Sequence, residues 1–409
     1  MIQDIGIGVA FFSAIVISLI TIVLLARHWL APQGETTVTV NGMPMNMSTG
    51  RNLLRALADN NIHLPSPCGG RGICGQCKIT IIAAAQPPLP TEAGQLTRGE
   101  ARQGIRLACA NKVRGEFSIK VPDALLRAER HTCEVASARN VSTFLREISL
   151  ELAPGDRLEF AAGQYVMLEA PPYQLHFRDI AVDPAYRITW EKAGLFDLSS
   201  KNLETTQRAY SLANSPAESD KAMLVVRIAL PPPGTPRGTP PGIVSSYIFG
   251  LGPGDQVDIT GPYGDFCAEN GGREMMFIAG GAGIAPIRSI ILDQLIRLGT
   301  SRRISFWYGA RALQDICYAD EFDLLSQEHP NFTWQVALSA PEKSDDWRGS
   351  TGFIHNVVYE QCLASHAAPD ELEYYLCGPP VMSSAVAQML EDLGVDRSSI
   401  FFDDFGAGS

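Results

Sequence analysis

The sequence has few charged residues and no surplus of positive ones. Charged side chains make up 19% of the 409 residues, and 33 lysines and arginines stand against 44 aspartates and glutamates. Nucleic-acid binding needs a basic face for the phosphates, so the formal net charge of −11 argues against such a partner. Hydrophobic residues make up 45%, which excludes a disordered acidic tail or a collagen-like chain.

The cysteine count and the hydropathy set two further limits. Nine is an odd number of cysteines, which argues against a fully paired disulfide framework and favours metal-binding or reactive thiols in a reducing compartment. The mean hydropathy of +0.02 is high for a cytosolic enzyme and indicates a membrane segment within the average. The length predicts about two to three domains.

A long uncharged run opens the chain. The 22 residues from Ile5 to Ala26 carry no charge, and as a helix they would span about 33 Å, enough to cross a hydrocarbon core of about 30 Å. We predict one transmembrane helix, with residues 1–30 as a membrane anchor. The competing interpretation is a cleaved signal peptide, but such peptides have a basic start and a shorter apolar core. Arg27 and His28 follow the run, which favours a cytoplasmic location for the rest of the chain.

Three globular regions are predicted after the anchor. Residues 36–122 form a small β-rich unit with one helix. Residues 131–268 contain strand-like runs separated by proline and glycine clusters, which is typical of a β-barrel or sandwich. Residues 269–409 alternate apolar strands with helices, which predicts a doubly wound parallel sheet.

Four cysteines have the spacing of a metal site. Cys68, Cys74 and Cys77 lie in one glycine-rich loop, and Cys109 follows after 31 further residues. Four thiolates suit zinc or an iron–sulfur cluster. The loop favours a 2Fe–2S cluster, because glycines let the backbone wrap closely around it and aim N–H groups at its sulfurs. It resembles the plant-type ferredoxin loop with one inserted residue. Zinc and unliganded thiols remain the alternatives.

Two motifs in the second region suit a flavin. The segment Arg208-Ala209-Tyr210-Ser211 offers a guanidinium fork for a pyrophosphate, a flat ring, and a hydroxyl for a ring nitrogen. Further on, Gly242-Ile243-Val244-Ser245-Ser246 opens a helix pattern, where N–H groups and hydroxyls suit phosphate oxygens. The alternative is a buried structural arginine and an ordinary serine cap. The candidate flavin residues are Arg208, Tyr210, Ser211, Gly242, Ser245 and Ser246.

A glycine-rich turn marks the third region. It runs from Ala279 to Pro286, after an apolar strand and before a helix. Glycines permit a tight turn and a close approach of phosphates, and the helix dipole favours their negative charge. The candidate nucleotide-binding residues in this turn are Gly280, Gly281, Gly283 and Pro286.

In this order the motifs resemble those of the ferredoxin–NADP reductase superfamily. The resemblance implies that Tyr308-Gly309-Ala310-Arg311 and Cys377-Gly378-Pro379-Pro380 end strands of the nucleotide domain. It also implies that a near-terminal aromatic, best matched by Phe405, covers the flavin ring. On the residues alone, Cys377 is equally an inert thiol, and the aromatic tail is more often core packing. The resemblance adds Gly309, Arg311, Cys377, Gly378 and Phe405 to the cofactor-binding residues and implies Ser211, Cys377 and Phe405 as catalytic ones.

Over the whole chain, the order of anchor, ferredoxin, flavin and nucleotide regions resembles that of the F subunits of the sodium-translocating NADH:quinone oxidoreductases. This implies a β-grasp ferredoxin domain, an antiparallel β-barrel that binds FAD, and an α/β domain that binds NADH. The implied activity takes hydride from NADH onto FAD and passes single electrons to a 2Fe–2S cluster, in a complex that reduces quinone and exports sodium. The implied partners are other membrane subunits, at the bacterial inner membrane, with the globular domains in the cytoplasm.

Two other functions remain open. One is the reductase component of an oxygenase with the same three modules, and the other is a tethered electron carrier without catalytic activity. The segment 170–207 is also open, because its aromatic residues suit either a partner-docking surface or a small core of their own. Cys133, Cys267, Cys317 and Cys362 are expected to be small buried hydrophobes.

Overall fold

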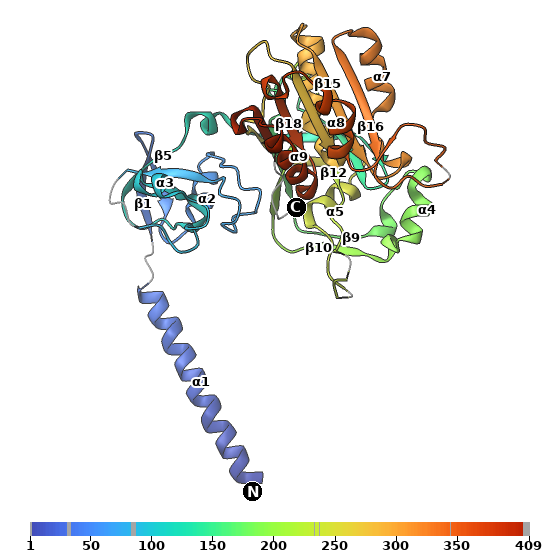
Figure 1. Cartoon of the computed structure of the whole chain (residues 1–409). Coiled ribbons are helices and arrows are strands. Elements are labelled where there is room, and N and C mark those ends of the chain that lie inside the picture. Colours follow the sequence, from blue (N-terminus) through green and yellow to red (C-terminus); the bar gives the residue numbers. More distant parts are fainter. Residues whose placement is uncertain are drawn as a thin grey trace. The chain divides into compact units, whose positions relative to one another are not determined.

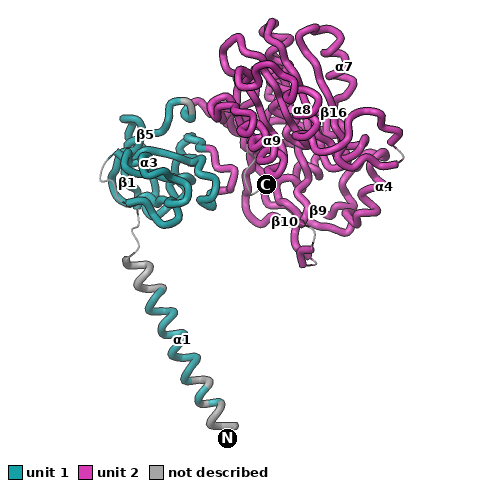
Figure 2. Tube along the Cα trace, in the orientation of Figure 1, with its two compact units in different colours: residues 1–64, 70–126 teal, residues 65–69, 127–409 magenta. Residues whose placement is uncertain are grey.

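The computed structural model describes residues 2–30, 34–82, 87–232, 234–236, 238–343 and 345–403. The chain divides into two compact units (Figure 2): Met1–Leu64 with Gly70–Leu126, and Pro65–Gly69 with Arg127–Ser409. Each unit is described by itself. The predicted domain bounds 36–122, 131–268 and 269–409 are not tested by this division and stay predictions.

The N-terminal segment is one helix, α1, from Ile2 to Leu30 (Figure 1). Within the described part of the chain, no helix is both long and apolar enough to cross a membrane. Several side chains of the predicted span, those of Ile5 and Ala26 among them, lie outside the described residues.

The first unit holds a five-stranded mixed sheet with a short helix against it. Its elements are β1 Glu35–Val40, β2 Met43–Ser48, α2 Leu53–Ala58, β3 Lys78–Ile81, α3 Arg98–Arg102, β4 Ile105–Leu107 and β5 Phe117–Lys120, in the sheet order β2-β1-β5-β3-β4. Strand β1 runs parallel to β5 and the other pairs are antiparallel. Helix α2 buries Leu53 and Leu57 in the same cluster as Val38 and Val40 of β1. The β-rich character is as predicted, but the prediction of one helix is wrong, because α3 is a second short helix between β3 and β4.

A six-stranded antiparallel barrel follows in the second unit. Its strands are β6 Glu129–Ser142, β7 Leu145–Glu151, β8 Tyr165–Ala170, β11 Thr206–Ser211, β12 Lys221–Arg227 and β13 Gln256–Tyr263, in the order β11-β8-β13-β6-β7-β12. The two outer strands meet where Leu212 pairs with Leu224, and the Ala213 N–H donates to the Met223 carbonyl at 2.8 Å. This contact joins the two ends of the sheet, so the barrel alternative is correct and the sandwich is not.

The segment before β11 forms a small folded insertion. It contains the hairpin of β9 Tyr173–His176 with β10 Ser199–Asn202, and the helix α4 Pro184–Lys192. Phe177 and Trp190 are fully buried with Phe249 in one cluster, and the Trp190 indole donates to the Thr143 carbonyl at 2.7 Å. Phe177 and Trp190 therefore fill a small core that they share with Phe249, and the alternative of a partner-docking surface stays a prediction.

The remainder of the second unit is a six-stranded sheet with helices on both faces. Its elements are β14 Met275–Gly280, α6 Ile284–Leu292, β15 Ile304–Ala310, α7 Ala319–Glu328, β16 Phe332–Leu338, β17 Ser350–Thr351, α8 Ile354–Gln361, β18 Glu373–Cys377, α9 Pro380–Asp392 and β19 Ile400–Asp403. All neighbours in the order β17-β16-β15-β14-β18-β19 are parallel. Phe277 packs with α6 and α7, whereas Ile278 packs with α8 and α9. This is the predicted doubly wound sheet.

The four cysteines expected to be buried hydrophobes divide into two pairs. Cys133 and Cys317 are buried, and burial raises the pKa of each thiol to about 12. Cys267 and Cys362 are only half-buried, so full burial is wrong for these two.

Candidate functional site

Strand pairing in the first unit brings Cys77 and Cys109 together. Cys77 directly precedes β3 and Cys109 follows β4, and these strands pair through Lys78 and Leu107. The Ala108 N–H donates to the Cys77 carbonyl at 2.9 Å. Both cysteine side chains are buried, whereas that of Cys74 is half-buried.

Two side chains that the sequence did not single out brace the Cys109 segment. The Asn52 amide caps α2 and donates to the Cys109 carbonyl at 2.6 Å. The carboxylate of Glu92, which is fully buried, accepts from the Leu107 N–H at 2.7 Å and from the Asn111 amide at 3.0 Å. Neither residue carries a motif signal, because their contacts depend on the tertiary fold.

The donor set and the loop suit an iron–sulfur cluster. Gly70, Gly72 and Gly75 all have φ between +67° and +79°, a conformation that residues with a Cβ rarely adopt. Buried thiols and a glycine-wrapped backbone are what a thiolate-bound cluster requires. Cys68 is buried too, but it lies in the segment Pro65–Gly69 that groups with the larger unit. Among the described residues, no group of three or more His, Cys, Asp and Glu is placed to hold a metal ion, so the four-cysteine ligand set stays a prediction.

Strand β11 carries the first flavin motif. Arg208 and Tyr210 share one face of the strand, because side chains alternate along it, and Ser211 at its end is buried. Burial raises the pKa of the Tyr210 phenol, which therefore keeps its proton and can donate a hydrogen bond. One Arg208 N–H donates to the Gln207 carbonyl at 2.7 Å.

The second flavin motif opens helix α5, Ile243–Gly250. A Cβ atom at Gly242 would lie 2.6 Å from the Ala229 Cβ and 2.8 Å from the Ser245 Oγ, so only glycine fits there. No side chain caps the helix at Gly242, which leaves its first N–H groups for an anion. The Ser245 hydroxyl accepts from the Ala229 N–H at 3.1 Å and donates to the Gly242 carbonyl at 3.2 Å. The buried Ser246 hydroxyl, in contrast, makes no hydrogen bond of ordinary geometry among the described residues and lies near the Tyr173 hydroxyl. These features fit a flavin pyrophosphate.

The glycine turn lies where the order of the parallel strands reverses. Chain order runs outward from β14 to β17 and then returns to β18 on the other side of β14, and ligands bind at such a switch point beyond the carboxyl ends of the strands. A Cβ at Gly283 would lie 2.0 Å from the Cys377 carbonyl oxygen, and one at Gly378 would lie 2.6 Å from the Met382 Cε. A Cβ at Gly280 would lie 2.8 Å from the Met382 Sδ. The backbone of the glycine turn is therefore in tight contact with the backbone at Cys377. Gly281 is required for a different reason, because its φ is +57°.

The other predicted nucleotide residues lie in α6 and at the carboxyl end of β15. Pro286 is buried in the first turn of α6. Gly309 is the next-to-last residue of β15, and a Cβ there would lie 3.1 Å from the Ile354 Cβ. The Arg311 side chain is 61% exposed. Its Nε donates to Asp315 at 3.2 Å, and its guanidinium lies 5.1 Å from the centre of the Phe144 ring.

Three elements of the second unit converge on one carboxylate. The Ser211 hydroxyl donates to an Asp403 carboxylate oxygen at 2.9 Å, and the Cys377 Sγ lies 4.0 Å from the same oxygen. Asp403 reaches this position because β19 runs parallel to β18 with Cys377 opposite Asp403. The structure thus joins two predicted catalytic residues, Ser211 and Cys377, through Asp403, which the sequence analysis did not identify. The remaining predicted catalytic residue, Phe405, lies outside the described residues.

Comparisons with known protein families match three parts of the chain. The model of a 2Fe-2S iron-sulfur cluster binding domain matches residues 38–114, that of an oxidoreductase FAD-binding domain matches residues 195–267, and that of an oxidoreductase NAD-binding domain matches residues 277–388. Each match lies inside one of the three predicted regions.

Solved structures share the fold of these parts. A cytochrome P450 reductase of Amycolatopsis is 25% identical, with a TM-score of 0.64 over 91% of this chain and 100% of its own. A ferredoxin reductase in carbazole 1,9a-dioxygenase is 24% identical, with a TM-score of 0.60 over 91% of this chain and 99% of its own. At 24% identity, the similarity to the ferredoxin reductase in carbazole 1,9a-dioxygenase shows a shared fold and nothing more.

Full-length relatives are much closer in sequence. The F subunit of the Na(+)-translocating NADH-quinone reductase of Methylococcus capsulatus is 48% identical over 98% of this chain and 99% of its own length. The F subunits of the reductases of Pseudomonas aeruginosa and Neisseria meningitidis are each 46% identical over at least 98% of both chains. The chain therefore belongs to the family of the F subunits of the Na⁺-translocating NADH-quinone reductases.

Proposed function

We propose that this chain is the membrane-anchored, NADH-oxidising subunit of a sodium-pumping quinone reductase. The observation that carries the proposal is the convergence of Ser211, Cys377 and Asp403 where the flavin strand meets the carboxyl ends of the nucleotide sheet. When bound, FAD takes up a hydride and gives up electrons singly, which a 2Fe–2S cluster then accepts one at a time. The residues of the chain bind, orient and shield these groups.

Asp403 fixes the orientation of the Ser211 hydroxyl. A serine hydroxyl has one hydrogen to donate and two lone pairs that accept. Because its hydrogen is directed at Asp403 at 2.9 Å, the Ser211 oxygen keeps its lone pairs and would act as an acceptor toward a flavin ring N–H. Cys377 lines the same point from the nucleotide side and sits in direct backbone contact with Gly283.

Two helix N-termini hold the phosphates. We assign the flavin pyrophosphate to Arg208 and to the start of α5, with the buried Ser246 as the nearby hydroxyl. Ser245 fixes the turn at Gly242 instead of reaching the ligand. The turn Gly281–Gly283 and the start of α6 would hold the NADH pyrophosphate. Phe405 is proposed as the aromatic cover of the flavin ring.

Cys68, Cys74, Cys77 and Cys109 are the proposed ligands of the cluster. Asn52 and Glu92 hold the backbone around Cys109, so their hydrogen bonds fix the direction in which its thiolate points. The support from this structure is the adjacency of Cys77 and Cys109 and the left-handed glycines of the loop.

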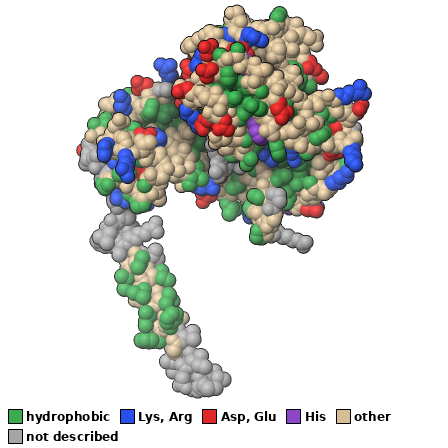
Figure 3. All heavy atoms as spheres, in the orientation of Figure 1, with side chains coloured by type: hydrophobic (Ala, Val, Ile, Leu, Met, Phe, Trp, Pro, Cys, Tyr) green, Lys and Arg blue, Asp and Glu red, His purple; other side chains and the backbone are tan. Residues whose placement is uncertain are grey.

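Helix α1 is the proposed single membrane span. Figure 3 shows hydrophobic side chains on the surface of this helix. Among them, Phe11 is 68% exposed, Phe12 69% and Val23 63%. Exposed apolar surface costs about 25 cal/mol per Å² in water, and a bilayer core relieves that cost. The globular domains then lie on the cytoplasmic side of the bacterial inner membrane, and the partners are the other membrane subunits of the complex.

The reductase component of an oxygenase is the second candidate, because the P450 reductase of Amycolatopsis has the same fold. The full-length identity of 46–48% to the F subunits of quinone reductases favours the first candidate. Purification of the intact chain in detergent with its partners separates the two. We expect membrane subunits to co-purify, and a soluble hydroxylase in their place would support the oxygenase function.

The enzymatic activity is tested by adding NADH to the full-length chain under anaerobic conditions. We expect bound flavin, iron and sulfide, with a loss of flavin absorbance when NADH is added. A preparation with normal flavin content that NADH does not bleach would contradict the enzyme and favour a tethered electron carrier without catalytic activity.

A further inference from the structure

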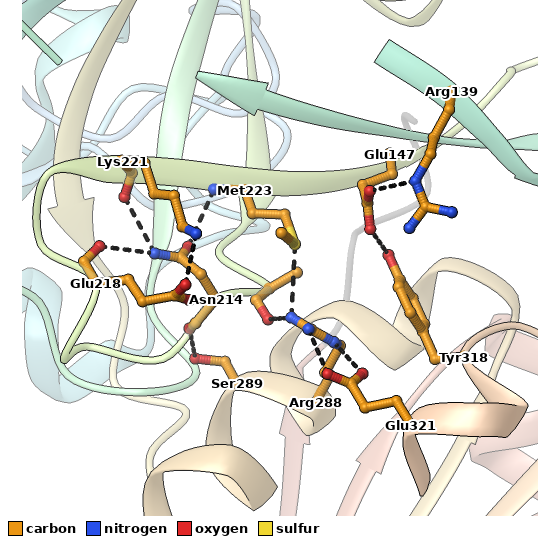
Figure 4. A network of polar contacts seen from close by, with 11 residues as sticks. Arg139, Glu147, Asn214, Glu218, Lys221, Met223, Arg288, Ser289, Tyr318 and Glu321 are labelled. Atoms are coloured by element: carbon orange, nitrogen blue, oxygen red, sulfur yellow. Dashed lines mark hydrogen bonds and ion pairs between the residues drawn. The ribbon is translucent and has the colours of Figure 1, made fainter. Parts of the chain in front are cut away.

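A pair of hydrogen bonds links the nucleotide helix to the end of the flavin strand. Arg288 and Ser289 are consecutive residues of α6, and they donate to the consecutive carbonyls of Ala213 and Asn214 at 2.5 Å and 2.7 Å (Figure 4). Ala213, Asn214 and Ser289 are fully buried, and Arg288 is 8% exposed. Water therefore does not compete for these bonds.

The two hydrogen bonds connect the proposed nucleotide-binding segment to the proposed flavin-binding segment. Helix α6 begins directly after the glycine turn at Gly283, and Ala213 lies two residues beyond Ser211. Each bond thus joins a segment that holds NADH to a segment that contacts the flavin ring. We call Arg288, Ser289, Ala213 and Asn214 the clamp.

Arg288 is held firmly from its own side. Two of its N–H groups donate to the two carboxylate oxygens of Glu321 on α7, both at 2.6 Å (Figure 4). Its guanidinium lies 4.9 Å from the centre of the Tyr318 ring, and the Tyr318 hydroxyl donates to Glu147 at 2.6 Å. Burial lowers the pKa of Arg288, but the hydrogen bonds and charge of Glu321 outweigh it and leave the pKa above its ordinary value.

The barrel side of the clamp is equally fixed. The Asn214 side-chain amide donates to the Glu218 and Lys221 carbonyls at 3.1 Å and 3.0 Å. Its oxygen accepts from the Met223 N–H at 3.0 Å. Because β12 begins at Lys221, the carbonyl that Ser289 contacts is anchored to the barrel wall.

We propose that Arg288 and Ser289 are positioning residues that set the distance between the nicotinamide and the flavin ring. This inference rests on the proposed function, in which a hydride carrying two electrons leaves NADH for the flavin, so that NADH is oxidised and the flavin reduced. The clamp residues exchange no proton or electron in that step. Transfer between two bound groups depends steeply on their separation, and a shift of about 1 Å costs about 100-fold in rate.

A second buried arginine provides a matched control. Arg302 pairs with Glu373, and it donates to the Arg273 carbonyl and, at 2.9 Å, to the Glu269 carbonyl. Its partners lie at or just before the starts of β14 and β18, whereas the proposed site lies beyond the ends of these strands. Loss of the Arg302 contacts should lower stability without changing the separation at the site.

The test compares Arg288→Lys, Ser289→Ala and Arg302→Lys in the full-length, FAD-loaded chain. A lysine cannot bond both Glu321 oxygens and the Ala213 carbonyl at once. We expect flavin reduction at saturating NADH to slow about 10- to 100-fold in Arg288→Lys and about threefold to tenfold in Ser289→Ala. The NADH concentration for half-maximal rate should change less than about threefold, and the primary deuterium isotope effect should rise. Arg302→Lys should lower the melting temperature and leave the reduction rate within about twofold.

Amide hydrogen exchange supplies a readout that needs no turnover. Residues 212–214 and 281–289 should exchange faster in both clamp variants and at the wild-type rate in Arg302→Lys. Equal slowing of reduction in Arg288→Lys and Arg302→Lys, or unchanged reduction and exchange in the clamp variants, would overturn the proposal. Should Arg288→Lys not fold, Ser289→Ala decides by the same criteria. Failure of NADH to bleach the wild-type flavin would instead refute the proposed function itself.

Discussion

The cysteine loop and the nucleotide turn are both rich in glycine, but for different physical reasons. In the cysteine loop, Gly72 has φ +76°, and the nearest atom to a Cβ there would be the Thr91 carbonyl oxygen at 4.0 Å. In the nucleotide turn, Gly283 has an ordinary φ of −61°, but its Cβ would overlap the Cys377 carbonyl oxygen at 2.0 Å. The first glycine is required by backbone conformation and the second by space.

This difference reflects what each loop does. Gly72 has open surroundings, so its positive φ, which lets the cysteine loop curve, is what requires a glycine there. The nucleotide turn closes against the neighbouring strand of its own sheet, so we expect its ligand to bind outside the turn, at the helix N-terminus. Substitutions should therefore have opposite effects on the two redox centres.

Removal of one cluster ligand should have the largest effect. In Cys68→Ala we expect complete loss of the cluster signal, because three thiolates do not hold a 2Fe–2S cluster stably. NADH oxidation with an artificial dye as acceptor should continue, since the flavin and nucleotide sites are unchanged. Absorbance and dye reduction are measured on the same sample. A collapse of dye reduction at normal flavin content would show that the proposed electron order is wrong.

Gly283→Ala should have the opposite effect: it should impair flavin reduction by NADH and keep the cluster. The new methyl group must displace the backbone at Cys377, so flavin reduction by NADH should fall about 100-fold or more. The cluster signal should stay intact, which makes this variant the counterpart of Cys68→Ala. Rapid mixing with NADH measures the rate, and a rate close to that of the wild type would refute the steric argument.

Asp403 provides a test of intermediate size. Asp403→Ala removes the acceptor of the Ser211 hydroxyl, and a hydrogen bond to a charged group contributes about 1.5–3 kcal/mol, so we expect flavin reduction to slow about 10- to 100-fold. Asp403→Asn keeps an oxygen that accepts and should slow it less than about threefold. Flavin content is measured in both variants. Equal rates for alanine and asparagine would argue against the role assigned to this hydrogen bond.

The smallest effect should come from Gly72. In Gly72→Ala the left-handed conformation costs about 1 kcal/mol, and Gly72→Asn should cost less because asparagine tolerates that conformation. Thermal loss of the cluster signal measures both variants against the wild type. A Gly72→Ala variant that lost its cluster entirely would mean that space, and not conformation, limits this position.

The sequence motifs predicted the fold better than the detailed site. The glycine turn, the flavin strand and the paired cysteines each combine local residues with an element whose periodicity is visible, so their placement follows from the chain. Asp403 was missed because only the parallel pairing of β19 with β18 sets it opposite Cys377. Arg288 and Ala213 are distant in sequence and meet through tertiary packing. The roles of Ser245 and Ser246 also could not be separated, because neighbouring serines differ only in what surrounds them.

The central claim is that electrons from NADH reach the flavin before they reach the cluster. It is tested most directly by mixing the full-length, FAD-loaded chain rapidly with NADH under anaerobic conditions while flavin and cluster absorbance are followed together. The account predicts that flavin absorbance falls first and that the cluster signal changes afterwards. A cluster that is reduced first, or reduced in a chain stripped of FAD, would contradict it.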